Sequence, residues 1–176
     1  MDPLDSEFEF RRIQALHETG LLSSPGLPEL DEICRRAREH FGVATALVTL
    51  IDQDTQVIKA RDGSDLQETP RAWAFCDYTI RTDLVFVVPD AAQDERFAAN
   101  PLVTGEPFIR FYAGAPLIYL QDIRFGALCL LDPQPRRAAE FTLGDRAELG
   151  GMADEVVSVI VQHKLTALSA ILGYNE

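Results

Sequence analysis

The chain has 176 residues, 47% of them hydrophobic, and its 28 Asp and Glu outnumber its 16 Lys and Arg to give a net charge of -12. This length and apolar content suit a single domain with a buried core. The acidic balance would repel phosphate backbones, so nucleic acid is excluded as an expected partner.

The N-terminal segment MDPLDSEFEF is acidic and lacks the basic and apolar parts of a signal peptide. No window approaches the roughly 20 apolar residues of a membrane span. The three cysteines are widely and irregularly spaced, which fits neither a disulfide framework nor a zinc site. We therefore expect a cytoplasmic chain with reduced thiols and no membrane partner.

Two helices are predicted first. Ser6 and Glu9 form a capping box, and Gly20 ends a helix whose expected apolar face is Phe10, Ile13, Leu16 and His17. We assign residues 1–22 to this N-terminal helix. A second helix runs from Pro28 to Gly42, with an apolar face made by Leu30, Ile33, Cys34, Ala37 and Phe41.

A sheet is predicted from the apolar runs that follow. ATALVTLID and TQVIKARD form a hairpin, and the polar stretch GSDLQETPRAW is expected to be a loop. LVFVVPD is a third strand, followed by a helical turn in DAAQDERF and a break at Asn100-Pro101. FIRFYAGAPLIYL and IRFGALCLL are two further strands. Five strands with flanking helices predict an α+β fold with a mostly antiparallel central sheet.

The last predicted element is a long helix over residues 142–176, with Thr142 and Asp145 at its cap and an end near Leu172. One apolar stripe is expected to pack on the domain, through Leu149, Met152, Ala153, Val156 and Ile160. A second stripe has a spacing near 3.5 residues and predicts a coiled-coil dimer interface, through Val157, Val161, Leu165, Leu168 and Leu172. The alternative is that both stripes are buried within one domain.

Four segments in order carry a family resemblance: FC at Cys76, VPDAAQDERFAANPLVTG, RFYAGAPL and GALCLLDP. Together they resemble the GAF family of small sensory domains, with residues 23–141 as the sensory core. The resemblance implies that the chain binds a small molecule or a partner. It also implies a homodimer that signals through the terminal helix, with an output domain of the kinase or cyclase type among the partners.

In GAF domains the ligand lies between one face of the sheet and the neighbouring loops, and the corresponding residues here are Trp73, Phe75, Cys76, Tyr78, Asp90, Phe97, Arg110 and Tyr112. Strand alternation puts Arg110, Tyr112 and Gly114 on one face. Arg110 and Tyr112 could hold an anionic or planar ligand, with Gly114 leaving room for it. Alternatively, Arg110 pairs with Asp77 or Asp90 and only ties a loop to the sheet. Trp73 is either a wall of the pocket or a plug in the core.

Cys76 stands at the start of a possible helix, where backbone amides would favour the thiolate and lower its pKa. It could equally be an inert buried residue. In this subgroup of the family a His commonly lies two residues further on, where this chain has Tyr78. The difference argues against a metal or proton-transfer role at Cys76.

Specialised relatives fit less well. The cyclic-nucleotide signature Asn-Lys-Phe-Asp-Glu is missing, and neither Cys76 nor Cys129 is followed by the His usual at bilin attachment sites. Hydrolase, P-loop, zincin and dinucleotide motifs are missing as well. We therefore expect a non-enzymatic sensory module without catalytic or metal residues and with an unidentified ligand. Two alternatives stay open: a redox enzyme like the free-methionine sulfoxide reductases, and a ligand-free GAF dimerisation module with a filled pocket.

Overall fold

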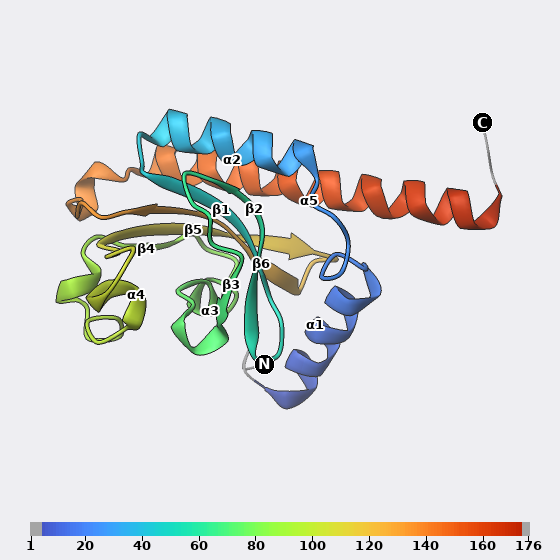
Figure 1. The fold of residues 1–176 in the computed structure, drawn as a ribbon, viewed down its shortest axis with the longest axis horizontal. Helices are drawn as coiled ribbons and strands as arrows, with labels where there is room; N and C mark the ends of the chain where they lie inside the picture. The colour runs from blue at the N-terminus through green and yellow to red at the C-terminus, as the bar shows by residue number, and fades with distance from the viewer. Residues whose placement is uncertain (1–4, 174–176) are drawn as a thin grey trace.

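The computed structural model describes residues 5–173 of the chain. Its centre is a six-stranded sheet in the order β3-β2-β1-β6-β5-β4, antiparallel throughout (Figure 1). The strands are β1 (Thr45–Ile51), β2 (Thr55–Asp62), β3 (Glu68–Pro70), β4 (Phe86–Val88), β5 (Phe111–Tyr119) and β6 (Ile123–Asp132). With helices on both faces, this architecture confirms the predicted α+β fold.

Helices cover both faces of the sheet (Figure 1). On one face lie α2 (Pro28–Phe41) and α5 (Leu143–Leu172), and on the other lie α3 (Cys76–Thr79) and α4 (Pro101–Thr104). α1 (Ser6–Glu18) packs against β6. Three short turns complete the fold: η1 (Arg71–Trp73), η2 (Ala91–Gln93) and η3 (Ala138–Glu140). Each sheet face has its own buried core, and β5 contributes to both because its side chains alternate.

The helix predicted between Pro28 and Gly42 is confirmed. Pro28 lies in its first turn, and Gly42 takes the left-handed conformation that ends the helix, with φ 63°. Cys34 is buried in the core, as its place on the apolar face predicts.

Three short elements were not predicted. The expected loop over residues 63–73 contains β3 and η1, because Thr69 and its neighbours pair with the start of β2. A strand of three residues has too few positions to show an alternating pattern. The expected break at Asn100-Pro101 is instead the start of α4, where the Asn100 side chain accepts a hydrogen bond from the Leu102 amide.

The predicted buried face of α1 is only partly right: Leu16 is buried and Ile13 half-buried, whereas Phe10 and His17 are exposed. Phe10 is 67% exposed, and the buried side chains are those of Phe8, Arg12 and Leu16. The helix is turned toward Arg12, because that guanidinium donates to the carbonyl oxygens of Ile51 and Arg124. The side chain that caps the helix is Asp5 rather than Ser6. Residues 1–4 of the predicted segment lie outside the described residues.

The capping box of α5 is confirmed at Thr142 and Asp145, and the helix ends at Leu172 with Gly173 in the left-handed conformation. Of the first stripe, four residues are buried and Met152 is half-buried. The second stripe leaves the domain: Val157 and Val161 are half-buried, whereas the remaining members, Leu165, Leu168 and Leu172, are exposed. This contradicts the alternative in which both stripes are buried within one copy. Figure 1 shows the end of α5 projecting beyond the sheet.

α5 also reaches the length and composition of a membrane span, which the sequence was not expected to contain. An 18-residue window in it has a mean hydropathy of 1.4. Leu149, Ala153, Val156 and Ile160, however, are packed against the sheet. The remaining turns, residues 161–172, rise only about 18 Å, against a hydrocarbon core of about 30 Å. The part of α5 beyond Ile160 that the structure describes is therefore shorter than the thickness of a bilayer core.

Candidate functional site

A small cavity lies on the sheet face that α3 and α4 cover. The strands contribute Leu47, Gln56, Tyr112, Cys129 and Leu131 to its wall, and the covering segments contribute Phe75, Cys76, Leu102 and Ile109. Its interior offers about 20 Å³ to the centres of water-sized molecules, which is room for about one water. The cavity is therefore nearly closed in this structure, and its walls are mainly apolar.

A buried polar cluster forms the inner end of the cavity. The Tyr112 hydroxyl donates to Cys76 Sγ at 3.1 Å and lies 2.7 Å from Thr79 Oγ1. Burial alone would raise the pKa of Cys76, but hydrogen bonds from Cys129, Thr49 and Tyr112 lower it below the ordinary thiol value. Its contact with Cys76, together with burial, raises the pKa of Cys129 well above the usual value. The shift at Cys76 has the expected direction, and its cause is side-chain hydrogen bonding rather than the amides of a helix.

The absence of a side chain at Gly114 leaves room for the Tyr112 hydroxyl rather than for a ligand. A Cβ atom at Gly114 would lie 2.1 Å from the Tyr112 hydroxyl oxygen and 2.9 Å from Thr79 Oγ1. The Tyr112 ring thus runs along β5 over its neighbour two residues on. The two residues do share a face, as predicted, but the expected ligand space above Gly114 is filled.

Arg110 does not line the cavity in this structure. Its guanidinium donates to the carbonyl oxygens of Val103, at 2.9 Å, and Ile109, at 3.0 Å. Both proposed ion pairs are wrong: Asp77 pairs with Arg71 and Arg81, and Asp90 caps η2 by accepting from the Ala92 amide. Arg110 still ties the end of α4 to the start of β5, but through backbone carbonyls.

The remaining predicted residues surround the cavity at different depths. Phe97 is buried and stacks on Phe75 with ring centroids 4.0 Å apart, so it supports the wall from behind. Tyr78 packs edge-on against Phe97 and lies under the Arg81 guanidinium. The Trp73 side chain is exposed, and its backbone carbonyl oxygen accepts from Asn100. The structure thus gathers Phe75, Cys76 and Tyr112 at the cavity.

Sequence reasoning missed Gln56 and Cys129 as cavity residues. Alternation along TQVIKA puts Gln56 on the same face as Ile58, so a polar side chain at a core-facing position was the available signal. Cys129 could be placed at the cavity only from the register between β6 and β1, in which Leu47 is its partner.

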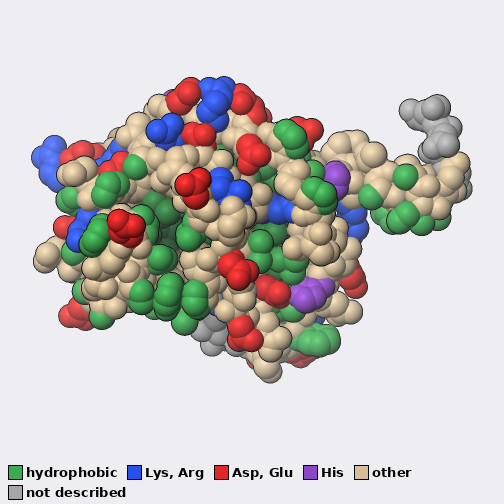
Figure 2. Space-filling model, in the orientation of Figure 1, with side chains coloured by type: hydrophobic (Ala, Val, Ile, Leu, Met, Phe, Trp, Pro, Cys, Tyr) green, Lys and Arg blue, Asp and Glu red, His purple; other side chains and the backbone are tan. Residues whose placement is uncertain are grey.

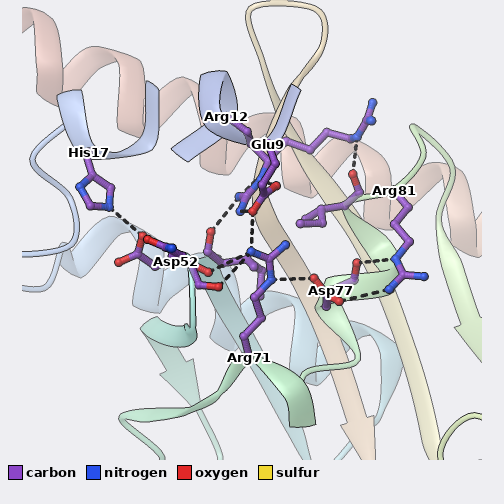
Figure 3. A network of polar contacts seen from close by, with 11 residues as sticks. Glu9, Arg12, His17, Asp52, Arg71, Asp77 and Arg81 are labelled. Carbon is purple, nitrogen blue, oxygen red and sulfur yellow. Dashed lines mark hydrogen bonds and ion pairs between the residues drawn. The ribbon is translucent and has the colours of Figure 1, made fainter. Parts of the chain in front are cut away.

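A chain of ion pairs joins this site to α1 (Figure 3). Asp77, beside Cys76, accepts from Arg71 Nε at 2.8 Å, and Arg71 also donates to Glu9 on α1. Glu9 in turn accepts from the buried Arg12 at 2.8 Å. The position of α3 is therefore linked electrostatically to that of the N-terminal helix. Within residues 5–173, no three His, Cys, Asp or Glu side chains gather as metal ligands would.

Acid should weaken this chain of ion pairs. Burial raises the pKa of Glu9, but hydrogen bonds from Arg12 and Arg71 outweigh it and hold that pKa below the ordinary value. A depressed native pKa stabilises the fold above the unfolded pKa of about 4.3, and this contribution is lost as pH falls through the native pKa. We expect urea unfolding from about pH 7 to about pH 3 to show this loss in the wild type and less of it in Glu9→Gln. Glu7→Gln removes an exposed carboxylate from the same turn and should keep the wild-type slope; equal slopes in all three proteins would contradict the prediction.

Comparison with known proteins agrees with this architecture. The sequence model of the GAF domain family matches residues 27–160. A cyclic di-GMP phosphodiesterase of Pseudomonas aeruginosa is 41% identical over 130 residues, which are 74% of this chain but only 22% of that protein. The chain therefore spans about a fifth of the length of this curated relative.

Solved structures share the fold at low identity. The GAF domain of a Coxiella burnetii phosphoenolpyruvate-protein phosphotransferase has a TM-score of 0.65 at 13% identity, over 93% of this chain and 99% of that one. A type II free methionine-R-sulfoxide reductase from Thermoplasma acidophilum has a TM-score of 0.61 at 15% identity, over 77% of this chain and 92% of that one. Together with the family match, these likenesses show that the chain belongs to the GAF domain family.

Proposed function

We propose that this chain is a cytoplasmic regulatory module that binds a small molecule in the cavity beside Cys76 and signals as a dimer through α5. One observation carries the proposal: the cavity and α5 lie on opposite faces of the same strand. β5 places Tyr112 in the cavity wall and Phe111 and Ala113 in the core beneath α5. A displacement of β5 at the cavity would therefore also move the residues that pack beneath α5.

The cavity in this structure corresponds to a closed form. Drug-sized ligands occupy pockets of about 300–1,000 Å³, far above the space beside Cys76, so binding requires the segments around α3 and α4 to move outward. A ligand shifts this equilibrium only by its differential affinity for the two forms. The opened segments would release Phe75 from Phe97.

Native mass spectrometry of the freshly purified chain tests the proposal. We expect a dimer that carries an extra small-molecule mass, and this mass should be absent from the denatured chain. A dimer without added mass would favour the alternative of a dimerisation module with a filled pocket.

The proposed dimer interface is the exposed apolar stripe at the end of α5. Figure 2 shows hydrophobic side chains along the projecting helix, where Leu165, Leu168, Ile171 and Leu172 are exposed. Two copies that paired these residues would bury them as in a short coiled coil.

Leu165→Asp should dissociate this dimer. Each buried leucine contributes about 1.5 kcal/mol or more, so loss in both copies should raise the dimer Kd by about 100-fold. Sedimentation velocity across a concentration series would measure the change. Ala170→Asp puts the same charge on the opposite side of the exposed helix and is the matched control. An unchanged dimer in Leu165→Asp would mean that the stripe is not the interface.

The output is proposed by analogy with the curated relative. The matched segment is a fifth of a cyclic di-GMP phosphodiesterase, which supports an output activity in cyclic-dinucleotide turnover beside the kinase or cyclase type implied by the resemblance. On this proposal the chain itself is regulatory and not an enzyme.

A redox activity is the second candidate, because Cys76 and Cys129 both line the cavity. In that reaction a sulfoxide oxygen would leave as water while the two thiols form a disulfide. Formation of methionine from free methionine sulfoxide, with a dithiol reductant to restore the thiols, would establish this redox activity. Cys129→Ser should then abolish turnover.

A further inference from the structure

We propose that the cavity selects a neutral, compact, largely apolar molecule that donates one N–H or O–H hydrogen bond to Gln56 Oε1. This inference rests on the proposed ligand-binding function and names the ligand class. Gln56 lines the cavity and is only 4% exposed. Among the residues 5–173, its Oε1 is the buried side-chain atom that lacks a hydrogen-bond partner.

The neighbours of Gln56 fix the orientation of its amide. The Thr69 hydroxyl donates its single proton to the Pro70 carbonyl oxygen at 3.0 Å. Thr69 Oγ1 can therefore only accept from Gln56, and the Gln56 amide nitrogen lies 3.1 Å from it. The oxygen must then be the amide atom that is left over. A buried acceptor without a partner is destabilising, and such atoms are rare in native proteins. A donor on the ligand would remove this penalty.

The rest of the wall argues against a charged ligand. The lining residues include no Lys, Arg, Asp or Glu. Arg110, the cation expected to hold an anion, donates instead to two backbone carbonyls. A buried charge without a partner is strongly unfavourable. An anionic ligand, as suggested by the sequence, is therefore disfavoured in this cavity.

The other polar groups at the cavity already have partners. The Tyr112 hydroxyl donates to Cys76 and lies within hydrogen-bond distance of Thr79. Gln56 is thus the position where a ligand gains a hydrogen bond without breaking one. The body of the ligand would contact apolar groups such as Leu47, Leu102 and Ile109.

A second hollow supplies the way in. It offers about 80 Å³ and shares Leu66, Pro107, Ile109 and Leu131 with the cavity, and it continues to Ser64 and Asp132 near the surface. Displacement of Leu66 and Pro107 would join the two spaces. Their combined size suits a molecule of a few heavy atoms up to a single ring.

Three monocyclic probes test the inference: phenol has an O–H donor, toluene has nearly the same shape without a donor, and benzoate is an anion. Binding is followed by backbone amide NMR shifts in the full chain, with Leu102 and Tyr112 as reporters of the cavity. In the wild type we expect phenol to bind about tenfold more tightly than toluene, and benzoate to bind most weakly.

Gln56→Leu should abolish this preference, so that toluene binds at least as tightly as phenol. The variant should fold, because it replaces a buried amide whose oxygen is unpartnered by an apolar group of similar size, and the Thr69 hydroxyl keeps its hydrogen bond to the Pro70 carbonyl. Gln53→Leu makes the same change at an exposed position in the turn between β1 and β2 and should keep the wild-type preference.

Three outcomes would overturn the inference, and they differ in what they say about the function. If phenol and toluene bind equally in the wild type and in Gln56→Leu, the cavity binds ligands but solvent rather than ligand satisfies Gln56. If benzoate binds most tightly, the ligand class is anionic and the inference is wrong. If no probe shifts the cavity reporters in either protein, the ligand-binding function fails along with the inference.

Discussion

Replacing Arg12 with methionine is expected to lower the free energy of unfolding by about 3–5 kcal/mol, because the change breaks a buried ionic and hydrogen-bonded group. Arg12 is 1% exposed, and it donates to the Ile51 carbonyl at 2.7 Å and to both carboxylate oxygens of Glu9. Methionine fills part of the volume but donates no hydrogen bond. The Ile51 and Arg124 carbonyls would lose a donor, and Glu9 would keep only Arg71.

Urea unfolding followed by circular dichroism would measure this loss. Arg11→Met is the matched control, because Arg11 precedes it on the same helix and forms an exposed pair with Asp122. An exposed pair contributes about 0–1 kcal/mol, so Arg11→Met should change stability little. Equal losses in the two variants would show that the buried position of Arg12 contributes nothing beyond a surface charge.

Arg12 also shows where sequence patterns mislead. Periodicity assigns the buried face of a helix from apolar residues, so an arginine is counted as polar and the helix is turned away from it. Here the adjacent ends of the two central strands, β1 and β6, present the carbonyls of Ile51 and Arg124, which only a long donor can reach. Phe10 is exposed as a consequence. The missing information was tertiary, since it concerned groups about 40 and 110 residues away along the chain.

Helices whose ends are marked by local sequence signals were predicted well. Pro28 and Gly42 mark the two ends of α2, and Thr142 with Asp145 marks the start of α5, because each signal acts within one helical turn. β3 was missed because its only support is pairing with residues 55–57 of β2. Local signals therefore recover long elements, and short elements need their partners.

The candidate site was predicted only in part, because local sequence signals again do not show the tertiary partners of a side chain. Phe75, Cys76 and Tyr112 lie at the cavity, because their segments match the family pattern. Arg110 was expected to face a ligand on strand alternation, but β5 begins at Phe111 and the guanidinium turns to the carbonyls near α4. A side chain at the end of a strand has no neighbour on both sides to fix its direction. Its partner could not be predicted from spacing.

Gly126→Ala should be the other severely destabilising change. A Cβ atom at Gly126 would lie 1.9 Å from the Thr49 carbonyl oxygen and 2.6 Å from its carbonyl carbon. These are backbone atoms of β1, the neighbouring strand, which pairs with β6 through Leu50 opposite Gly126. Overpacking in a core typically costs about 1–3 kcal/mol, and a clash with backbone belongs at the upper end because no side chain can rotate away.

The matched control is Gly151→Ala on α5, where an added Cβ meets nothing within 4 Å. Alanine in a helix interior is favoured over glycine by about 1 kcal/mol, so this variant should be more stable than the wild type. Thermal and urea unfolding of the two variants should therefore move in opposite directions.

The Gly126 substitution also bears on function, because the strand it displaces carries Thr49 toward the cavity. Thr49 Oγ1 accepts from the Ala127 amide at 3.2 Å and contributes a hydrogen bond that lowers the pKa of Cys76. If β1 moves away from β6, Cys76 loses that contact, so its thiol should react with an alkylating reagent at a different rate in Gly126→Ala than in Gly151→Ala. A Gly126→Ala protein with wild-type stability and wild-type thiol reactivity would contradict this prediction. It would show that β1 and β6 can accommodate the added methyl group without disturbing the site. The close approach of the two strands at Gly126 would then have no part in holding the cavity together.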